Sequence, residues 1–175
     1  MKINNLHWIE GIKTDLRRSQ NTKGWLLVKL ASIFAEARLH NVLGRARVLI
    51  ADRNYFARQA LRQVFEREKD FAICGEAVHG RDAVTAALLL RPDLVVLDLV
   101  MPVMNGVGAA RTLKRLMPAL PMIVRYGLKD KCVTQATKLV EIGALVSKTE
   151  PLGSLVHRAR RLLAGTEVAS ASASI

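Results

Sequence analysis

The carboxylate of Asp98 follows the apolar run Leu94–Leu97, a position from which it could take part in a reaction. A short, continuous apolar run bounded by turn signals predicts a strand that is buried on both faces, as in a parallel sheet. Open α/β sheets place their reactive groups at the carboxyl ends of such strands. Pro102 cannot continue the strand, and Asn105-Gly106 predicts a turn that opens the next helix. Asp98 is therefore the first candidate functional residue; the plainer alternative is that it only caps its own loop.

The elements that would position Asp98 alternate between strand and helix patterns. Strands are predicted at 48–51, 71–77, 94–97, 122–125 and 144–146, and helices at 54–68, 82–90, 106–117, 131–142 and 151–164. Five strands alternating with five helices predict an α/β fold with a doubly wound parallel sheet.

The segments outside this pattern predict an extension and a tail. We expect residues 1–44 to form an N-terminal extension with an amphipathic helix at about 23–43, residues 46–165 the main domain, and residues 166–175 a flexible tail. The apolar part of 23–43 is too short, and too interrupted by Lys29, for a transmembrane segment. Its wide apolar face would need the main domain, a second copy of the chain or a membrane surface as a partner. The alternative is that the start codon is misassigned and that this segment folds poorly.

Composition narrows the function classes. The 175 residues are half apolar, with a net charge of +12 at pH 7 that is spread along the chain. Such an excess fits either nucleic-acid binding or a merely basic surface. Cys74 and Cys132 form no CxxC pair and fit a reducing compartment. The four histidines share no ligand spacing, so no zinc or haem site is predicted.

Four blocks of the sequence, in this order, resemble the response-regulator receiver domains of two-component signalling. They are the segments 48–52, 75–83, 98–106 and 146–148. The first two look most like receivers that precede a helix-turn-helix output domain. The resemblance implies a flavodoxin-like (βα)5 fold for roughly residues 47–165.

The resemblance also implies a role for particular residues. Asp98 would be the phosphoacceptor that attacks a phosphohistidine of a sensor kinase, and Asp52 one of two acids that hold Mg²⁺. Lys148 would pair with the acceptor and then with the phosphoryl group. Met101, Pro102 and Gly106 would shape the loop after the acceptor. The plain alternatives are that Asp52 caps a helix and that Lys148 is a surface lysine.

Three positions depart from the family pattern. Arg53 stands where the family has a second acid, so a cation replaces an oxygen ligand of Mg²⁺ and could reach Asp98 as a salt bridge. Tyr126 stands where a small hydroxyl residue switches, and Leu145 where an aromatic residue often follows it. These departures predict an atypical receiver in which Mg²⁺, implied by the resemblance, is opposed by Arg53.

We expect a cytoplasmic, bacterial signalling protein that is not an enzyme. It would act through contacts of its fourth helix, fifth strand and fifth helix with a sensor histidine kinase, another signalling protein or a second copy, with or without phosphorylation of Asp98. The alternative is a DNA-binding transcriptional regulator whose output domain is lost or replaced by the basic N-terminal segment. A haloacid-type hydrolase is disfavoured because Val100 stands where that class has a second Asp.

Overall fold

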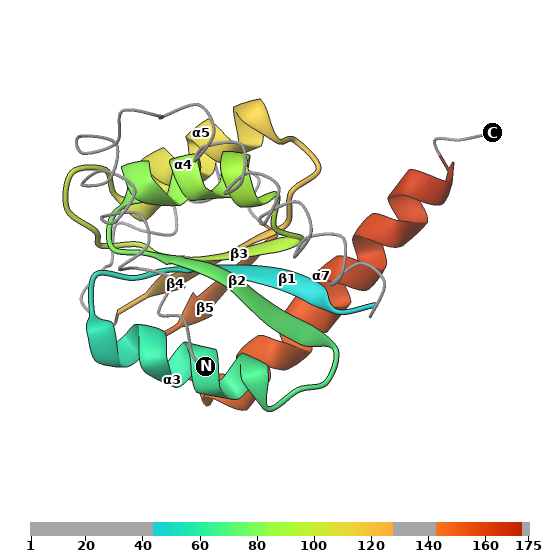
Figure 1. Cartoon of the computed structure of the whole chain (residues 1–175), viewed down its shortest axis with the longest axis horizontal. Helices are drawn as coiled ribbons and strands as arrows, with labels where there is room; N and C mark the ends of the chain where they lie inside the picture. Colours follow the sequence, from blue (N-terminus) through green and yellow to red (C-terminus); the bar gives the residue numbers. More distant parts are fainter. Residues whose placement is uncertain (1–43, 128–142, 173–175) are drawn as a thin grey trace, which may run out of the picture.

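A parallel β-sheet lies between two layers of helices in the computed structural model, which describes residues 44–127 and 143–172, with the backbone alone from 166 onward (Figure 1). The strands are β1 (Ala46–Ala51), β2 (Phe71–Ala77), β3 (Leu94–Asp98), β4 (Met122–Tyr126) and β5 (Ala144–Ser147). They pair in the order β2-β1-β3-β4-β5, and each pair is parallel. The predicted fold class is confirmed.

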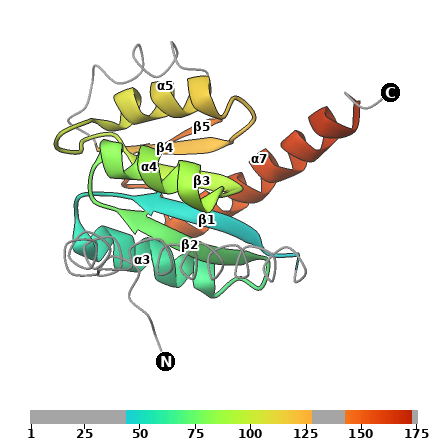
Figure 2. The same cartoon turned by 45° about the horizontal axis from the view of Figure 1, so that its top comes forward.

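The helices cover the two faces of the sheet in pairs. Helices α4 (Gly80–Leu90) and α5 (Gly106–Leu116) lie on one face, and α3 (Tyr55–Glu66) and α7 (Leu152–Ser172) lie on the other (Figures 1 and 2). The helices that the sequence predicts at 23–43 and 131–142 lie outside the described residues.

Alternation along the strands builds a separate apolar core on each face. On β3, Val95 and Leu97 belong to the core under α4 and α5, whereas Leu94 and Val96 belong to the core under α3 and α7. Because successive side chains of a strand point to opposite faces, Asp98 continues the row of Leu94 and Val96. Strand β3 is therefore buried on both of its faces, as the continuous apolar run predicts.

Local signals set the helix ends. The Asn54 side chain accepts a hydrogen bond from the Ala57 N–H at 3.1 Å and caps α3. The Asn105 side chain accepts one from the Gly108 N–H at 2.8 Å and caps α5. Such caps satisfy backbone donors that the first helical turn leaves free.

The last helix is longer than the sequence predicts. We expected it to end at Ala164, but α7 continues to Ser172. The residues of α7 beyond Ala164 include no proline, so nothing in them forces the helix to end. No helix within 44–127 and 143–172 is long and apolar enough to cross a membrane.

Candidate functional site

Two buried carboxylates meet at the point where the strand order reverses. Asp98 ends β3, and Asp52 follows β1, the neighbouring strand in which Ala51 pairs with Leu97. In an open α/β sheet this reversal of strand order leaves a crevice at the carboxyl ends of the strands. Asp52 is 1 % exposed and Asp98 is 2 % exposed. Two carboxylates this close together and this buried need a cation.

Lys148 supplies a cation to both carboxylates. Its backbone N–H donates to the Tyr126 carbonyl at 2.7 Å, which fixes it just beyond the end of β5. Its Nζ then lies 2.8 Å from Asp98 Oδ1 and 3.2 Å from Asp52 Oδ2. The structure thus brings together the three side chains that the sequence singles out for the site.

The two carboxylates differ in how many of their oxygens accept a hydrogen bond. Asp52 Oδ1 also accepts from the Asn54 N–H at 2.9 Å, and Asp98 Oδ1 accepts from the Val100 N–H at 3.2 Å. Asp98 Oδ2 is buried and has no hydrogen-bond partner in the described part of the chain. Burial, followed by the neighbouring Asp52 charge, raises the pKa of Asp98, although Lys148 opposes the rise.

A second buried cation, Arg125, was missed by the sequence analysis. Arg125 pairs with Asp98 across β3 and β4 and is 6 % exposed. Its Nε is buried and lacks a hydrogen-bond partner among the described residues. Burial lowers the pKa of Arg125, while the charges of Asp52 and Asp98 counteract that effect. A signal was available: a lone charged residue in an otherwise apolar central strand indicates a buried ionic contact.

Arg53 does not form the salt bridge with Asp98 that its place in the sequence suggested. Its side chain is exposed, and no ion pair joins it to Asp98 within the described ranges. The salt bridge of Asp98 is made by Lys148 instead.

The remaining predicted residues lie around the loop that follows Asp98. Met101 is buried in the core under α4 and α5, and Pro102 is exposed. Gly106 is required by packing, because a Cβ there would run into the Asp98 carbonyl group and come within 2.9 Å of the Leu99 Cα. Tyr126 and Leu145 are partly buried and pack against the core on the α4 and α5 face. These two residues therefore lie on the opposite face of the sheet from Ile123 and Val146, which belong to the core under α3 and α7.

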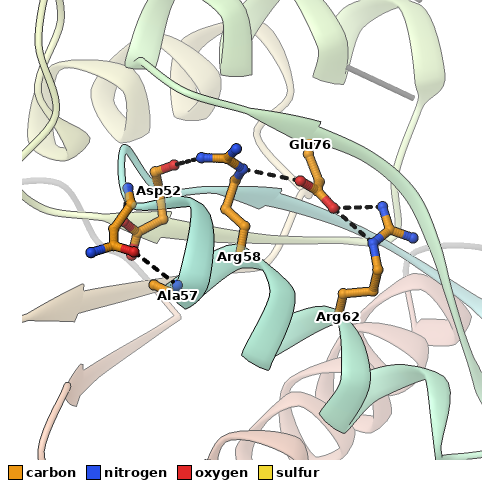
Figure 3. A network of polar contacts seen from close by, with 6 residues as sticks. Asp52, Ala57, Arg58, Arg62 and Glu76 are labelled. Carbon is orange, nitrogen blue, oxygen red and sulfur yellow. Dashed lines mark hydrogen bonds and ion pairs between the residues drawn. The ribbon is translucent and has the colours of Figure 1, made fainter. Parts of the chain in front are cut away.

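A buried ionic network, also missed, supports the loop that carries Asp52 (Figure 3). Arg58 of α3 donates from Nε to Glu76 of β2 at 3.0 Å and from a terminal nitrogen to the Asp52 carbonyl at 2.8 Å. Arg62, one turn later, donates to the other oxygen of Glu76 at 2.7 Å. Because Glu76 is buried, two arginines balance its charge and tie α3 and β2 to the end of β1.

The described residues bring two carboxylates to the site. Across residues 44–127 and 143–172, no group of three or more His, Cys, Asp and Glu side chains could hold one. The two carboxylates that remain already share the ammonium group of Lys148. The site is therefore a salt-bridged pair of carboxylates with a second cation on the next strand.

Comparison with known sequences identifies the relatives of this arrangement. The model of the response regulator receiver domain matches residues 48–160. A protein-glutamate methylesterase/protein-glutamine glutaminase of Pyrococcus abyssi is 32% identical over 118 residues, which are 67% of this chain and 32% of that protein. Its counterpart from Caldanaerobacter subterraneus is 32% identical over 111 residues, covering 63% of this chain and 30% of that protein. The chain thus spans about a third of the length of these relatives.

Solved structures agree on the fold. The response regulator domain of Thermotoga maritima CheB superposes with a TM-score of 0.63 and 23% identity, covering 68% of this chain and 96% of that one. A LuxR-family two-component response regulator from Aurantimonas superposes with a TM-score of 0.65 and 24% identity, covering 69% and 86%. At this identity the likeness concerns the fold alone.

The relatives correct one expectation. We expected this sequence to fall among proteins that are not enzymes, but the curated relatives from Pyrococcus and Caldanaerobacter are enzymes by name. The expectation was wrong because it was drawn from the receiver pattern alone. That pattern covers only part of each relative and is silent about what the rest of such a protein does.

Proposed function

Because the chain belongs to the response-regulator receiver domain family, we propose that it serves phosphorelay signalling by accepting a phosphoryl group on Asp98. Receiver domains interact with histidine kinases and other signalling proteins, and a phosphohistidine is the donor that we propose here. The observation that carries the proposal is the state of the Asp98 carboxylate. Lys148 holds one of its oxygens at 2.8 Å, and the other oxygen has no partner among the described residues.

The proposed transfer is a substitution at phosphorus. An oxygen of the Asp98 carboxylate attacks, the new P–O bond forms, and the P–N bond to the donor imidazole breaks. The electron pair of that bond stays on the imidazole, which takes a proton from solvent. Lys148 lies where it can stabilise the charge that gathers on the phosphoryl oxygens. Since its side chain is 31 % exposed and Asp98 is buried, Lys148 has to move aside for the donor to enter.

Receiver domains generally bind Mg²⁺ at their acidic site; we infer that this chain is atypical and binds it weakly. Mg²⁺ needs several hard oxygen ligands in a near-octahedral arrangement. Arg53 stands where the family has its second acid, and Asp52 and Asp98 already share the ammonium group of Lys148. Our inference rests on this shortage of carboxylates.

The output that we propose is a protein–protein contact in the cytoplasm, with a partner protein or a second copy. The relatives' names connect receivers of this kind with protein-glutamate methylesterase and glutaminase activity. An effector of that class, in the same polypeptide or in a partner, is the first output to test.

A DNA-binding regulator is the second candidate, because the net charge is +12. Some of the positive charge in the described domain is already engaged in ion pairs, by Arg58, Arg62, Arg158 and Arg160. Such side chains are less free to neutralise phosphates. DNA binding that falls steeply with salt would favour this candidate.

The test of the proposed function is intact-protein mass spectrometry after incubation with phosphoramidate or acetyl phosphate, with Mg²⁺ and with EDTA. We expect a gain of one phosphoryl group that is absent in Asp98→Ala. No gain under any condition, or the same gain in Asp98→Ala, would contradict the assignment of Asp98 as the acceptor.

A further inference from the structure

Four charged side chains of the described residues lie at the carboxyl ends of neighbouring strands, and their charges cancel; we call this group, Asp52, Asp98, Arg125 and Lys148, the acceptor pocket. Asp52 and Asp98 contribute two negative charges, and Lys148 and Arg125 contribute two positive charges. Lys148 contacts both carboxylates directly. Arg125 lies beside Asp98 on the neighbouring strand and interacts electrostatically with Asp52 and Asp98. The charges of these four described side chains therefore sum to zero.

Arg125 is not a surface residue that happens to lie nearby. A guanidinium stays protonated in proteins, so its charge cannot be removed by burial. Burying such a charge is costly unless anions compensate it. At 6 % exposure, Arg125 depends on Asp52 and Asp98 for that compensation.

The pocket also leaves one donor and one acceptor free. Asp98 Oδ2 and Arg125 Nε are the two buried side-chain polar atoms without a partner in the described part of the chain, and they belong to residues that pair across β3 and β4. Buried polar atoms are nearly always hydrogen-bonded, so such a pair requires an explanation. A tetrahedral oxyanion attached to Asp98 would supply acceptor oxygens for the Arg125 N–H.

We propose that Arg125 takes the electrostatic place of a divalent cation in this pocket and binds the phosphoryl oxygens once Asp98 is modified. With a doubly charged phosphoryl group in place of the Asp98 charge, Asp52, Lys148 and Arg125 leave a net charge of −1. Without Arg125 that charge would be −2. The phosphoryl part of the proposal rests on the function proposed above, whereas the replacement of the cation does not.

The experiment compares Mg²⁺ binding by isothermal titration calorimetry in the full chain and in matched variants. Arg125→Met removes the buried charge and keeps an unbranched chain of similar length. Arg53→Met makes the same change at the exposed arginine. The double variant Arg125→Met/Asp98→Asn restores a neutral pocket, and circular dichroism checks that each variant is folded.

We expect Arg125→Met to bind Mg²⁺ at least about tenfold more tightly than the unaltered chain, because the pocket then carries a net charge of −1. Arg53→Met and the double variant should show no such gain. Equal Mg²⁺ binding by Arg125→Met and the unaltered chain would overturn the proposal. Gains of the same size in Arg125→Met and Arg53→Met would overturn it too. If Arg125→Met is unfolded without metal, its folding is compared in Mg²⁺ and in EDTA. Folding in Mg²⁺ but not in EDTA supports the proposal. Failure to fold under both conditions overturns it.

A second measurement tests the phosphoryl part with beryllofluoride, a phosphoryl analogue, observed by ¹⁹F NMR. The unaltered chain should bind it in EDTA, and Arg125→Met should bind it only in Mg²⁺. Binding by Arg125→Met in EDTA would contradict a role for Arg125 at the phosphoryl group. If no form binds beryllofluoride with or without Mg²⁺, the acceptor role of Asp98 fails, and the calorimetry still decides whether Arg125 replaces the cation.

Discussion

Lys148 Nζ lies 2.8 Å from Asp98 Oδ1, so that an ammonium group from the end of β5 fixes one oxygen of a carboxylate at the end of β3. The same ammonium group reaches Asp52 at 3.2 Å. One flexible side chain thereby holds together two buried acids that would otherwise repel each other. This contact sets the charge of the pocket, its accessibility and the conditions under which Asp98 can react.

The first prediction concerns the ionisation of Asp98. Its pKa is raised in the folded protein by burial and by Asp52, so folding favours the protonated form. The stability that protonation contributes is complete below the pKa of the unfolded chain and is lost as the pH rises through the folded value. In EDTA, the difference in Tm between Asp98→Asn and the unaltered chain should therefore shift in favour of Asp98→Asn as the pH rises from about 4 to about 7.

Asp70 offers a control of opposite sign. A hydrogen bond from Arg160 lowers the pKa of Asp70, so its ionised form favours the folded state. Its contribution is present at neutral pH and is lost as the pH falls through the lowered value. Asp70→Asn should accordingly lower the Tm at pH 7. The same pH dependence of the Tm difference in Asp98→Asn and Asp70→Asn would show that the pKa of Asp98 is not raised in the folded protein.

The second prediction concerns the buried ionic network of Figure 3. Arg58→Met should reduce the free energy of unfolding by about 2–4 kcal/mol, because Glu76 loses a buried partner and the Asp52 carbonyl loses a donor. Arg62→Met should cost less, about 1 kcal/mol, because the Arg62 side chain is more exposed and Arg58 still balances Glu76. Urea denaturation measures both, and a larger loss in Arg62→Met would refute this ranking.

The third prediction concerns Arg53. Because its side chain is exposed, we attribute the poor fit for Mg²⁺ to a missing ligand more than to repulsion by the arginine. Arg53→Asp should therefore create measurable Mg²⁺ affinity by adding hard oxygen ligands next to Asp52. Isothermal titration calorimetry would show a saturable signal in Arg53→Asp and little change in Arg53→Met. If both variants gain equally, repulsion by Arg53 is the main effect.

The fourth prediction compares two glycines. In Gly106→Ala, the new Cβ collides with the Asp98 carbonyl group and the Leu99 Cα, which should cost about 1–3 kcal/mol of unfolding free energy. In Gly153→Ala, nothing lies within 4 Å of the new Cβ in helix α7, so helix propensity should stabilise the protein by up to about 1 kcal/mol. Urea denaturation of both variants tests the pair; similar effects at the two positions would show that crowding at Gly106 is unimportant.

The sequence by itself determined the parallel α/β fold and the place of Asp98, because both depend on short-range signals. A continuous apolar run, a strand-ending aspartate and a following proline and glycine are visible in neighbouring residues. The approach of Lys148 to Asp98 could also be anticipated, because the carboxyl ends of parallel strands share one edge of the sheet.

The tertiary structure alone decided which arginine lies beside the acceptor. Arg53 follows Asp52 directly and was the natural candidate, yet it is exposed, whereas Arg125, remote in sequence, pairs with Asp98 and is buried. The network of Arg58, Glu76 and Arg62 likewise depends on how helix α3 packs against β2, the strand that follows it, because it joins side chains 14 and 18 residues apart. Burial and the pairing of strands arise from long-range packing, and the charge balance of a pocket depends on both.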